Sequence, residues 1–446
     1  MSTKVVTRFA PSPTGFPHLG TAMYALLNYV YARQNNGKVI MRSEDTDPTR
    51  SKPEFEAAIK DDLKWLGIEA DEFARQTDRL DIYKAYIQKL IESDKAYISN
   101  EKKINEDGSE GPVRDVVRLR NQNKIVTFTD MARGEISVDT TDLKDFVIAR
   151  DINSPLYHLT VVVDDFEMGV THIIRGEDGI ANTPRQILIQ EAIGAPRPIY
   201  AHYPFVLGAN RQKMGKRNGA VGIREYRKQG YLPEAVLNFC LLLVWHPKDD
   251  REMFTLSEII EHFELERIGK SGAILDPVKL DWFNREYMKL LSEDELTKRA
   301  LTYCSTLGVE QPGISRYIPM LLERIDKFGD IPVLLGKTEK TETNQAKWGE
   351  LDFLLNAPAV TKELLIGKSG AIEHEIKQHL EWIMSNGTNR EVVWPYAEQN
   401  GKGKVLWPMR VALSGKEKSP DPFALVTMLG NDESRARIRL ALDVLK

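Results

Sequence analysis

The stretch of sequence that decides the fold is residues 5–21, VVTRFAPSPTGFPHLGT. Its apolar start, 5–10, is typical of a buried strand, and the Pro/Gly cluster at 11–15 predicts a turn. Residues 21–33 are rich in Ala, Leu, Met and Tyr and contain neither Gly nor Pro, which predicts a helix. The chain therefore opens with a strand, a loop and a helix.

The next residues repeat this alternation. Residues 39–41 form a second short apolar run, and Pro53 suits the first position of a helix, where its missing N–H costs nothing. Gly67 is placed to end that helix. Apolar residues recur between them at helical spacing: Phe55, Ile59, Leu63 and Leu66. Strand, helix, strand and helix at these lengths predict a parallel, doubly wound sheet of the Rossmann type.

A change of pattern near residue 81 indicates an inserted α+β domain. A helix over 82–92 leads into a polar stretch at 99–111, and alternating β-type runs follow to residue 150. The α/β pattern returns at 170–175. Later elements are expected in this order: a helix capped by Thr183, with Pro184 at its first position and Gly194 at its end, a strand over 199–207, an apolar helix over 233–245, and amphipathic helices beyond 252. The predicted fold is α/β, with a split Rossmann-type catalytic domain, the inserted domain and an all-α C-terminal region.

Composition sets limits on the class of protein. The chain has 446 residues, of which 42% are hydrophobic and 28% charged, so we expect several globular domains rather than a disordered or fibrous chain. The longest apolar stretch, 237–245, is far shorter than the ~20 residues of a membrane span. No basic region followed by an apolar core opens the chain, so we expect a cytoplasmic protein.

Two clusters have the chemistry of a nucleotide site. Free N–H groups where the first helix begins attract phosphate, Gly20 lets a flat ring approach the backbone, and His18 can donate a hydrogen bond to a phosphate. The simpler interpretation is a tight turn with a helix-capping histidine. The basic cluster Lys213-Met-Gly-Lys216-Arg217 can close over a triphosphate, or it is a solvated surface turn.

Together, the two clusters resemble class I aminoacyl-tRNA synthetases, and longer strings elsewhere in the chain resemble the glutamyl-tRNA synthetase family of that class. His18-Leu-Gly20 and Lys213–Arg217 resemble the two signatures of the class. The family strings are Arg8–Gly15, Arg42–Asp47, Val163–Asp165, Ile174–Asp178, Asn182–Gln186, Tyr231–Ala235 and Pro408–Gly415. The resemblance runs nearly from end to end.

The resemblance implies roles for particular residues. The ATP contacts would be His18, Gly20, Thr21, Lys213, Met214, Gly215, Lys216 and Arg217, with His18, Lys213 and Lys216 acting in catalysis. The glutamate contacts would be Arg8, Ala10, Ser12, Glu44, Tyr157 and Arg175. Arg8 and Arg175 can each fork onto a carboxylate and Glu44 can take the ammonium, but which arginine takes which carboxylate stays open. Alternatively, Arg8 pairs with an acidic neighbour such as Asp45 or Asp47 and only holds strand ends together.

The resemblance also implies a division of the chain. Residues 1–80 and 186–245 would be the two halves of the catalytic domain, and 81–185 the inserted domain that holds the acceptor stem. Residues 246–315 would contact the tRNA stem. Residues 316–446 would read the anticodon with aromatics such as Trp394, Tyr396 or Trp407, although each of these is more often a core residue.

Three departures from the family pattern stand out. Thr21 replaces the second histidine of the first signature, and Gly215 replaces the usual serine of the phosphate loop. Gly179 stands where many relatives have a larger side chain near the adenine. Some relatives hold zinc with cysteines of the inserted domain, but the chain has only Cys240 and Cys304, so we expect no zinc and two buried, inert thiols.

The expected reaction is ATP-dependent activation of L-glutamate, with Mg²⁺ carried by the nucleotide, and transfer to the 3′ end of tRNA(Glu). Charging of tRNA(Gln) stays open, and we expect a monomer. A glutaminyl-tRNA synthetase has a β-barrel anticodon region, and a truncated tRNA-modifying relative lacks the last third. A non-catalytic RNA-binding relative would not need His18 and Lys216, and a small adenylate-forming ligase would not need residues 316–446.

Overall fold

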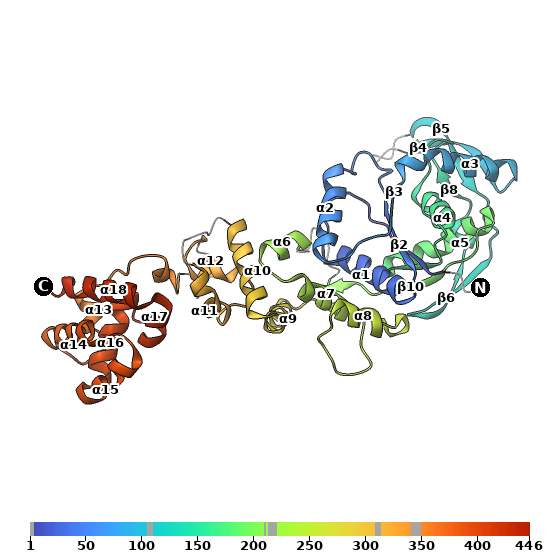
Figure 1. The fold of residues 1–446 in the computed structure, drawn as a ribbon. Helices are drawn as coiled ribbons and strands as arrows, with labels where there is room; N and C mark the ends of the chain where they lie inside the picture. Colours follow the sequence, from blue (N-terminus) through green and yellow to red (C-terminus); the bar gives the residue numbers. More distant parts are fainter. Residues whose placement is uncertain (1–3, 105–109, 209–210, 213–220, 308–313, 340–348) are drawn as a thin grey trace. The chain divides into compact units, whose positions relative to one another are not determined.

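The computed structural model describes residues 4–446 except 105–109, 209–210, 213–220, 308–313 and 340–348. The chain forms two compact units, residues 1–287 and 288–446 (Figure 1). Each unit is described by itself.

The first sheet of the first unit is parallel and has the order β1-β2-β3. Its strands are β1 (Val6–Phe9), β2 (Lys38–Ser43) and β3 (Glu72–Arg75), joined by helices α1 (Leu19–Gln34) and α2 (Pro53–Trp65). Pro53 is the first residue of α2, and Gly67 follows the helix with a φ of +76°, which glycine adopts without strain. The predicted opening of the doubly wound sheet is confirmed.

A second sheet continues from the free edge of β1. It has the order β7-β6-β10-β9, with β9 (His172–Gly176) and β10 (Ile199–Tyr203) parallel, and β6 (Ile125–Asp130) and β7 (Gly134–Asp139) antiparallel. The Thr171 N–H donates to the Val6 carbonyl oxygen at 2.9 Å, so β9 lies beside β1. The doubly wound fold is thus split in the sequence, because β1 and β9 lie side by side and the inserted segment separates them along the chain.

Helix α5 (Thr183–Ile193) connects β9 to β10, and Gly194 ends it in the left-handed conformation as expected. The predicted cap is wrong: Asn182 holds the capping position and Thr183 is the first helical residue. The strand predicted over 199–207 is two strands, because Pro204 lacks the N–H that would continue β10. The second is β11 (Val206–Leu207), which pairs with β12 (Ala273–Ile274).

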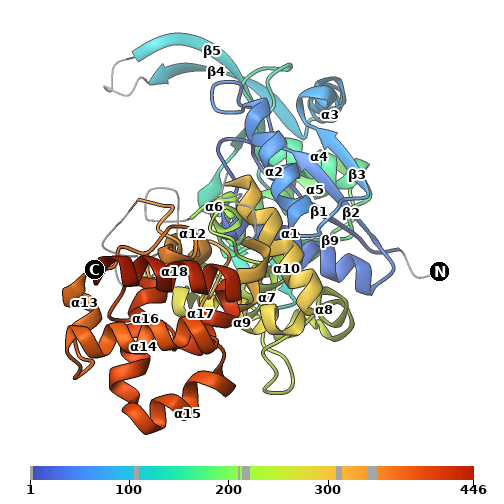
Figure 2. The same ribbon diagram turned by 60° about the vertical axis from the view of Figure 1, so that its left-hand side comes forward.

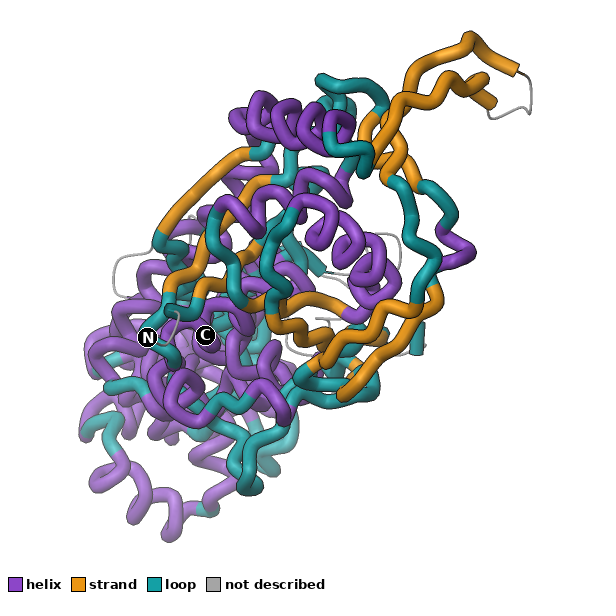
Figure 3. Tube along the Cα trace, turned by 90° about the vertical axis from the view of Figure 1, so that its right-hand side faces the viewer, coloured by secondary structure: helices purple, strands orange, loops and turns teal. Residues whose placement is uncertain are grey.

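The insertion contains helices and an antiparallel sheet. Helix α3 (Leu80–Glu92) precedes β4 (Ala96–Ile104), β5 (Glu110–Leu119) and β8 (Phe146–Ala149), and α4 (Tyr157–Glu167) follows. Figures 2 and 3 show the β4–β5 hairpin projecting from the unit. The polar stretch predicted near residue 99 belongs to this hairpin, where exposed strand residues need no apolar partner.

The remaining helices of the first unit are α6 (Ile223–Lys228), α7 (Pro233–Leu242), α8 (Leu256–His262) and α9 (Pro277–Leu290), the last of which ends just past its boundary. Every described regular element of the second unit is helical, which confirms the all-α prediction: α10 (Glu293–Thr306), α11 (Ile318–Leu322), α12 (Asp330–Leu334), α13 (Lys362–Ile366), α14 (Glu373–Asn386), α15 (Arg390–Asn400), α16 (Lys402–Ser414), α17 (Pro422–Leu429) and α18 (Asn431–Val444). Helix α16 packs against α13, α14, α15, α17 and α18.

Both thiols are buried, Cys240 in α7 and Cys304 in α10. This burial confirms the prediction and raises the pKa of Cys240 to about 12 and that of Cys304 to about 11, which makes their thiolates scarce at neutral pH. Among the described helices, none has the length and apolar character to cross a membrane.

Candidate active site

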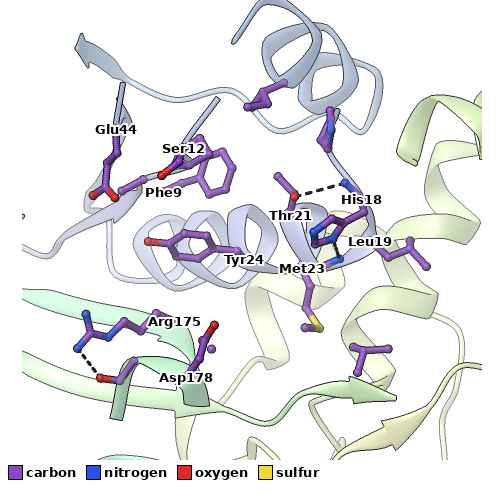
Figure 4. A pocket seen from close by; sticks show the side chains of 18 of the residues that line it. Phe9, Ser12, His18, Leu19, Thr21, Met23, Tyr24, Glu44, Arg175 and Asp178 are labelled. Atoms are coloured by element: carbon purple, nitrogen blue, oxygen red, sulfur yellow. Dashed lines mark hydrogen bonds between the residues drawn. The ribbon is translucent and has the colours of Figure 1, made fainter. Parts of the chain in front are cut away.

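One pocket brings the described candidate residues together. It has a volume of about 520 Å³ and lies where β1 leads into α1, opposite the end of β9 (Figure 4). Its lining includes every described residue predicted to contact ATP or glutamate: Arg8, Ala10, Ser12, His18, Gly20, Thr21, Glu44, Tyr157 and Arg175. The phosphate-loop candidates Lys213, Met214, Gly215, Lys216 and Arg217 lie outside the described residues.

His18 caps helix α1. Its Nδ1 accepts the Gly20 N–H at 3.1 Å, and the Thr21 hydroxyl accepts the His18 N–H at 3.3 Å. The simpler interpretation of this histidine is therefore correct as local structure, and the same residue also lines the pocket. Because Nδ1 is the acceptor, the neutral ring carries its hydrogen on Nε2.

Gly20 makes this cap possible. A Cβ at this position would lie 2.9 Å from Cε1 of His18. The sequence suggested that Gly20 leaves room for a flat ring of the ligand. The structure adds a second reason, since the imidazole itself needs the space.

On one side of the pocket, Arg8 belongs to a buried ionic cluster. Its Nε lies 3.2 Å from Asp165 Oδ1, and its Nη1 donates to the Tyr24 hydroxyl at 2.9 Å. Arg42 contacts the same Asp165 oxygen at 2.7 Å and Glu44 at 3.3 Å. Burial alone would lower the pKa of Arg8, but the Asp165 carboxylate holds it above the usual value.

The acidic partners proposed for Arg8 in the alternative interpretation are wrong. Asp45 accepts from the Thr77 hydroxyl at 2.6 Å, and Asp47 accepts from the Thr49 hydroxyl at 2.6 Å. Asp165 is the partner, and it lies 157 residues away in the sequence. Arg42 and Asp165 both lie within strings that resemble the family, but the resemblance alone predicted no role for either residue.

On the other side, Arg175 is buried without a carboxylate partner among the described residues. Its Nη2 donates to the Gly179 carbonyl at 3.1 Å and to the Thr183 hydroxyl at 2.8 Å, and its Nε donates to His202 Nε2 at 3.0 Å. Its Nη1 has no hydrogen-bond partner in the described part of the chain. Burial lowers the pKa of Arg175.

The absence of a side chain at Gly179 leaves room for the side chain of Arg175. A Cβ at position 179 would lie 2.2 Å from Arg175 Nε and 2.6 Å from its Cδ. The departure noted in the sequence therefore has a structural correlate: the Arg175 side chain lies directly against the bare backbone of Gly179. Figure 4 shows Arg175 across the pocket from Glu44 and Tyr24.

A split Rossmann-type fold, a histidine where the first helix begins and a pocket lined by buried arginines are features expected of a class I aminoacyl-tRNA synthetase. Residues 4–106 and 98–282 match the family model described as tRNA synthetases class I (E and Q), catalytic domain, and residues 295–442 match the anticodon binding domain. The curated glutamate–tRNA ligase of Aquifex aeolicus (strain VF5) is 37% identical, with 99% of each chain covered. That of Sulfurihydrogenibium sp. (strain YO3AOP1) is 36% identical, with 98% of each covered. The chain belongs to the glutamate–tRNA ligase family.

Solved structures agree with this assignment. The crystal structure of a glutamate tRNA ligase from Elizabethkingia meningosepticum CCUG26117 in complex with its amino acid has a TM-score of 0.84 and 29% identity, covering 99% of this chain and 100% of that one. The chain is thus a ligase that forms an aminoacyl-tRNA, activating L-glutamate with ATP and transferring it to tRNA. A glutaminyl enzyme and a truncated relative are disfavoured, because the match to glutamate–tRNA ligases is full-length.

Proposed function

We propose that the pocket binds glutamate between its two sides. Arg175 is the cation that takes a substrate carboxylate, and the observation that carries this is its charge: Asp165 already neutralises Arg8, whereas Arg175 has no carboxylate partner among the described residues. A buried cation is favourable only when a counter-charge reaches it, and glutamate supplies one. Ala10, Ser12 and Tyr157 line the space between.

Glu44 takes the glutamate ammonium. Burial raises the pKa of Glu44, while Arg42 and Arg8 oppose this rise. A cation arriving beside the carboxylate would stabilise its ionised form. On this side Arg42 contacts Glu44 at 3.3 Å, and Arg8 shares Asp165 with Arg42, so the two arginines would hold both carboxylates in place.

ATP would bind at the start of α1, against His18, Gly20 and Thr21. Lys213–Arg217 lie outside the described residues, and the family resemblance assigns them to its phosphates. The described residues include no group of three His, Cys, Asp or Glu side chains that could hold a metal ion. Mg²⁺ would be carried by the nucleotide phosphates, where it neutralises phosphate charge. Residues 81–185 contain no cysteine, so the enzyme would need no zinc.

The glutamate α-carboxylate oxygen attacks the α-phosphorus of ATP; the new P–O bond gives glutamyl-adenylate as the bond to pyrophosphate breaks. A ribose hydroxyl at the 3′ end of tRNA then attacks the activated carbonyl, and AMP leaves. The protein supplies position and charge stabilisation: His18 Nε2–H is a donor toward phosphate, and Lys213 and Lys216 neutralise charge as it develops.

The rest of the chain would bind tRNA(Glu), with tRNA(Gln) as an open second acceptor. Residues 81–185 would hold the acceptor stem, 246–315 the adjoining stem and 316–446 the anticodon. Trp382 stacks on Tyr396 with ring centroids 3.7 Å apart, and Trp407 donates to the Leu364 carbonyl at 3.0 Å, so both candidates already pack within the unit. Trp394 also packs within the unit, beside Phe423 and beneath Arg390 and Lys402, so the contacts single out none of the three as the residue that stacks on a base. We infer a cytoplasmic monomer.

The test is ATP–pyrophosphate exchange. Exchange should require glutamate and cognate tRNA together, since the family generally activates its amino acid only with tRNA bound. Robust exchange without tRNA would count against the proposal. Charging assays on purified tRNA(Glu) and tRNA(Gln) decide the second acceptor, and loss of activity to a zinc-selective chelator with Mg²⁺ kept would overturn the zinc-free assignment.

A further inference from the structure

A buried chain of hydrogen bonds leads away from the pocket behind Arg175. Arg175 Nε lies 3.0 Å from His202 Nε2, and His202 Nδ1 lies 2.6 Å from Asp130 Oδ2. His202 belongs to β10, and Asp130 is the last residue of the neighbouring strand, β6. His202 and Asp130 are both fully buried, and neither lines the pocket.

The direction of each hydrogen bond is fixed by chemistry. An arginine Nε–H can only donate, so His202 Nε2 accepts and the ring hydrogen sits on Nδ1, where it is donated to Asp130. Burial lowers the pKa of His202, which agrees with a neutral ring. A protonated ring would turn an N–H toward the N–H of Arg175.

The two carboxylate oxygens of Asp130 have different hydrogen-bond partners. Its Oδ1 accepts the backbone N–H groups of Ala132 and Arg133, each at 3.0 Å, and its Oδ2 faces His202. The carboxylate is therefore held by the turn after β6 and cannot rotate without breaking those bonds. A carboxylate fixed in this way selects one tautomer of the histidine.

We propose that the Asp130–His202 pair is a positioning relay that orients the Arg175 guanidinium for glutamate while leaving its positive charge available. A carboxylate placed directly on Arg175 would orient it equally well but would neutralise it, as Asp165 does for Arg8. A neutral imidazole orients without neutralising. With Nε on His202 and Nη2 on Gly179 and Thr183, Nη1 is left for the substrate.

This relay rests on the proposed binding of glutamate by Arg175. The alternative is that the pair only ties β6 to β10. The two differ in what happens to the KM for glutamate, because a tie between strands affects stability alone.

The decisive variants differ in whether a hydrogen-bond acceptor still faces the Nε of Arg175. In Asp130→Asn the amide oxygen stays on the backbone N–H groups, so the NH₂ faces His202 Nδ1 and forces the hydrogen onto Nε2, against Arg175. His202→Leu removes the acceptor, whereas in His202→Gln an amide oxygen can replace Nε2. Tyr200→Phe is the matched control: Tyr200 is equally buried on β10, and its hydroxyl donates to Gln190 at 3.1 Å.

The experiment measures the KM for glutamate, the KM for ATP and the melting temperature of each full-length variant in tRNA-dependent exchange. We expect Asp130→Asn and His202→Leu to raise the KM for glutamate about ten-fold or more, with the KM for ATP within a few-fold. His202→Gln should stay close to wild type, and Tyr200→Phe should change only the melting temperature.

Each other outcome overturns the relay in a distinguishable way. If Arg175→Gln raises the KM for glutamate while Asp130→Asn leaves it unchanged, glutamate binding by Arg175 stands and the relay is wrong. If Arg175→Gln itself has no effect on this KM, the proposed role of Arg175 fails and the relay fails with it. Should His202→Leu not fold, the near-isosteric Asp130→Asn still decides.

Discussion

Arg8 and Arg175 are both buried, both line the pocket and each is the last residue but one of its strand, yet their surroundings differ. Arg8 shares Asp165 with Arg42, and Glu44 and Asp164 complete a cluster in which cations and carboxylates alternate. Arg175 instead contacts a histidine, a hydroxyl and a carbonyl, all of them neutral. One arginine is neutralised by the fold, and the other is held by it without being neutralised.

The difference separates two uses of buried charge. A balanced cluster is strongly destabilised when one member is removed, because its partners stay buried without compensation. A buried cation without a counter-charge already lowers the stability of the fold. Its removal should therefore change the free energy of unfolding little and weaken substrate binding strongly. The following variants test whether the two sides respond in these opposite ways.

The largest effect is expected on the balanced side. Asp165→Asn removes the carboxylate shared by Arg8 and Arg42 and should lower the free energy of unfolding by about 3–5 kcal/mol. Urea denaturation measures it. Asp47→Asn is the control, because Asp47 is exposed and accepts only from local groups, and it should change stability little. A stability loss in Asp165→Asn no larger than that of the control would mean that the cluster is not balanced by Asp165.

Arg175→Gln should instead weaken glutamate binding and leave the stability of the fold largely unchanged. Loss of a charge that pairs with a buried carboxylate costs about 2–5 kcal/mol, or roughly 30- to 5000-fold in the KM for glutamate. The preference for glutamate over glutamine should narrow, while the free energy of unfolding stays level or rises. Steady-state kinetics with both amino acids, beside a urea titration, make the measurement. A less stable variant with an unchanged KM would reverse the two roles.

Gly179→Ala tests the same side from the backbone. The added methyl would meet the Arg175 side chain at 2.2 Å, and overpacking of this kind costs typically about 1–3 kcal/mol. We expect the KM for glutamate to rise because Arg175 must move. In an Arg175→Gln background the alanine should add almost nothing to that KM, since residues that act through each other are not additive. Full additivity in the double variant would show that Gly179 acts on its own.

The smallest effect concerns an unbalanced anion. Asp62 of α2 is buried, both carboxylate oxygens lack hydrogen-bond partners among the described residues, and Arg224 approaches only to 3.8 Å. Burial raises its pKa from the ordinary 3.8 to about 6. The folded state therefore holds this proton more tightly than the unfolded state, and stability falls as pH rises from about 4 through 6.

Asp62→Asn should remove the loss of stability that accompanies this rise in pH. At pH 7 we expect a gain of about 1–2 kcal/mol in the free energy of unfolding, allowing for solvent screening, and no gain below pH 4. Urea titrations from pH 4 to 8 follow the difference. Asp61→Asn, at the exposed neighbour that pairs with Arg227, should show no such trend. A gain that does not depend on pH would exclude the titration of Asp62 as its source.

The fold was largely predictable because its signals are local. The apolar run before residue 10, Pro53 and Gly67 act within one turn of the chain, and the structure places strand, helix and turn there. Thr183 was wrongly predicted to cap α5. Its hydroxyl instead accepts from Arg175 and donates to the Gly179 carbonyl, so a contact with the pocket replaced the local rule.

The site was predictable only as a set of residues. Motif strings led to nine residues that the structure brings into one pocket, but they could not show how charges pair. Asp165 lies 157 residues from Arg8, and His202 is a single polar residue within an apolar strand. Such pairings form when strands that are distant in the sequence meet. The spacing of residues within one element therefore cannot predict them.

The burial of both thiols has a practical use. Because Cys240 and Cys304 are buried and burial raises the pKa of both thiols, we expect them to react slowly with maleimides in the folded protein. A single cysteine at an exposed position, such as Lys368→Cys on the second unit, should then be the labelled site. A fluorophore attached there could report tRNA arrival in real time on an otherwise unmodified chain. The protein therefore needs no prior removal of its own cysteines before such measurements.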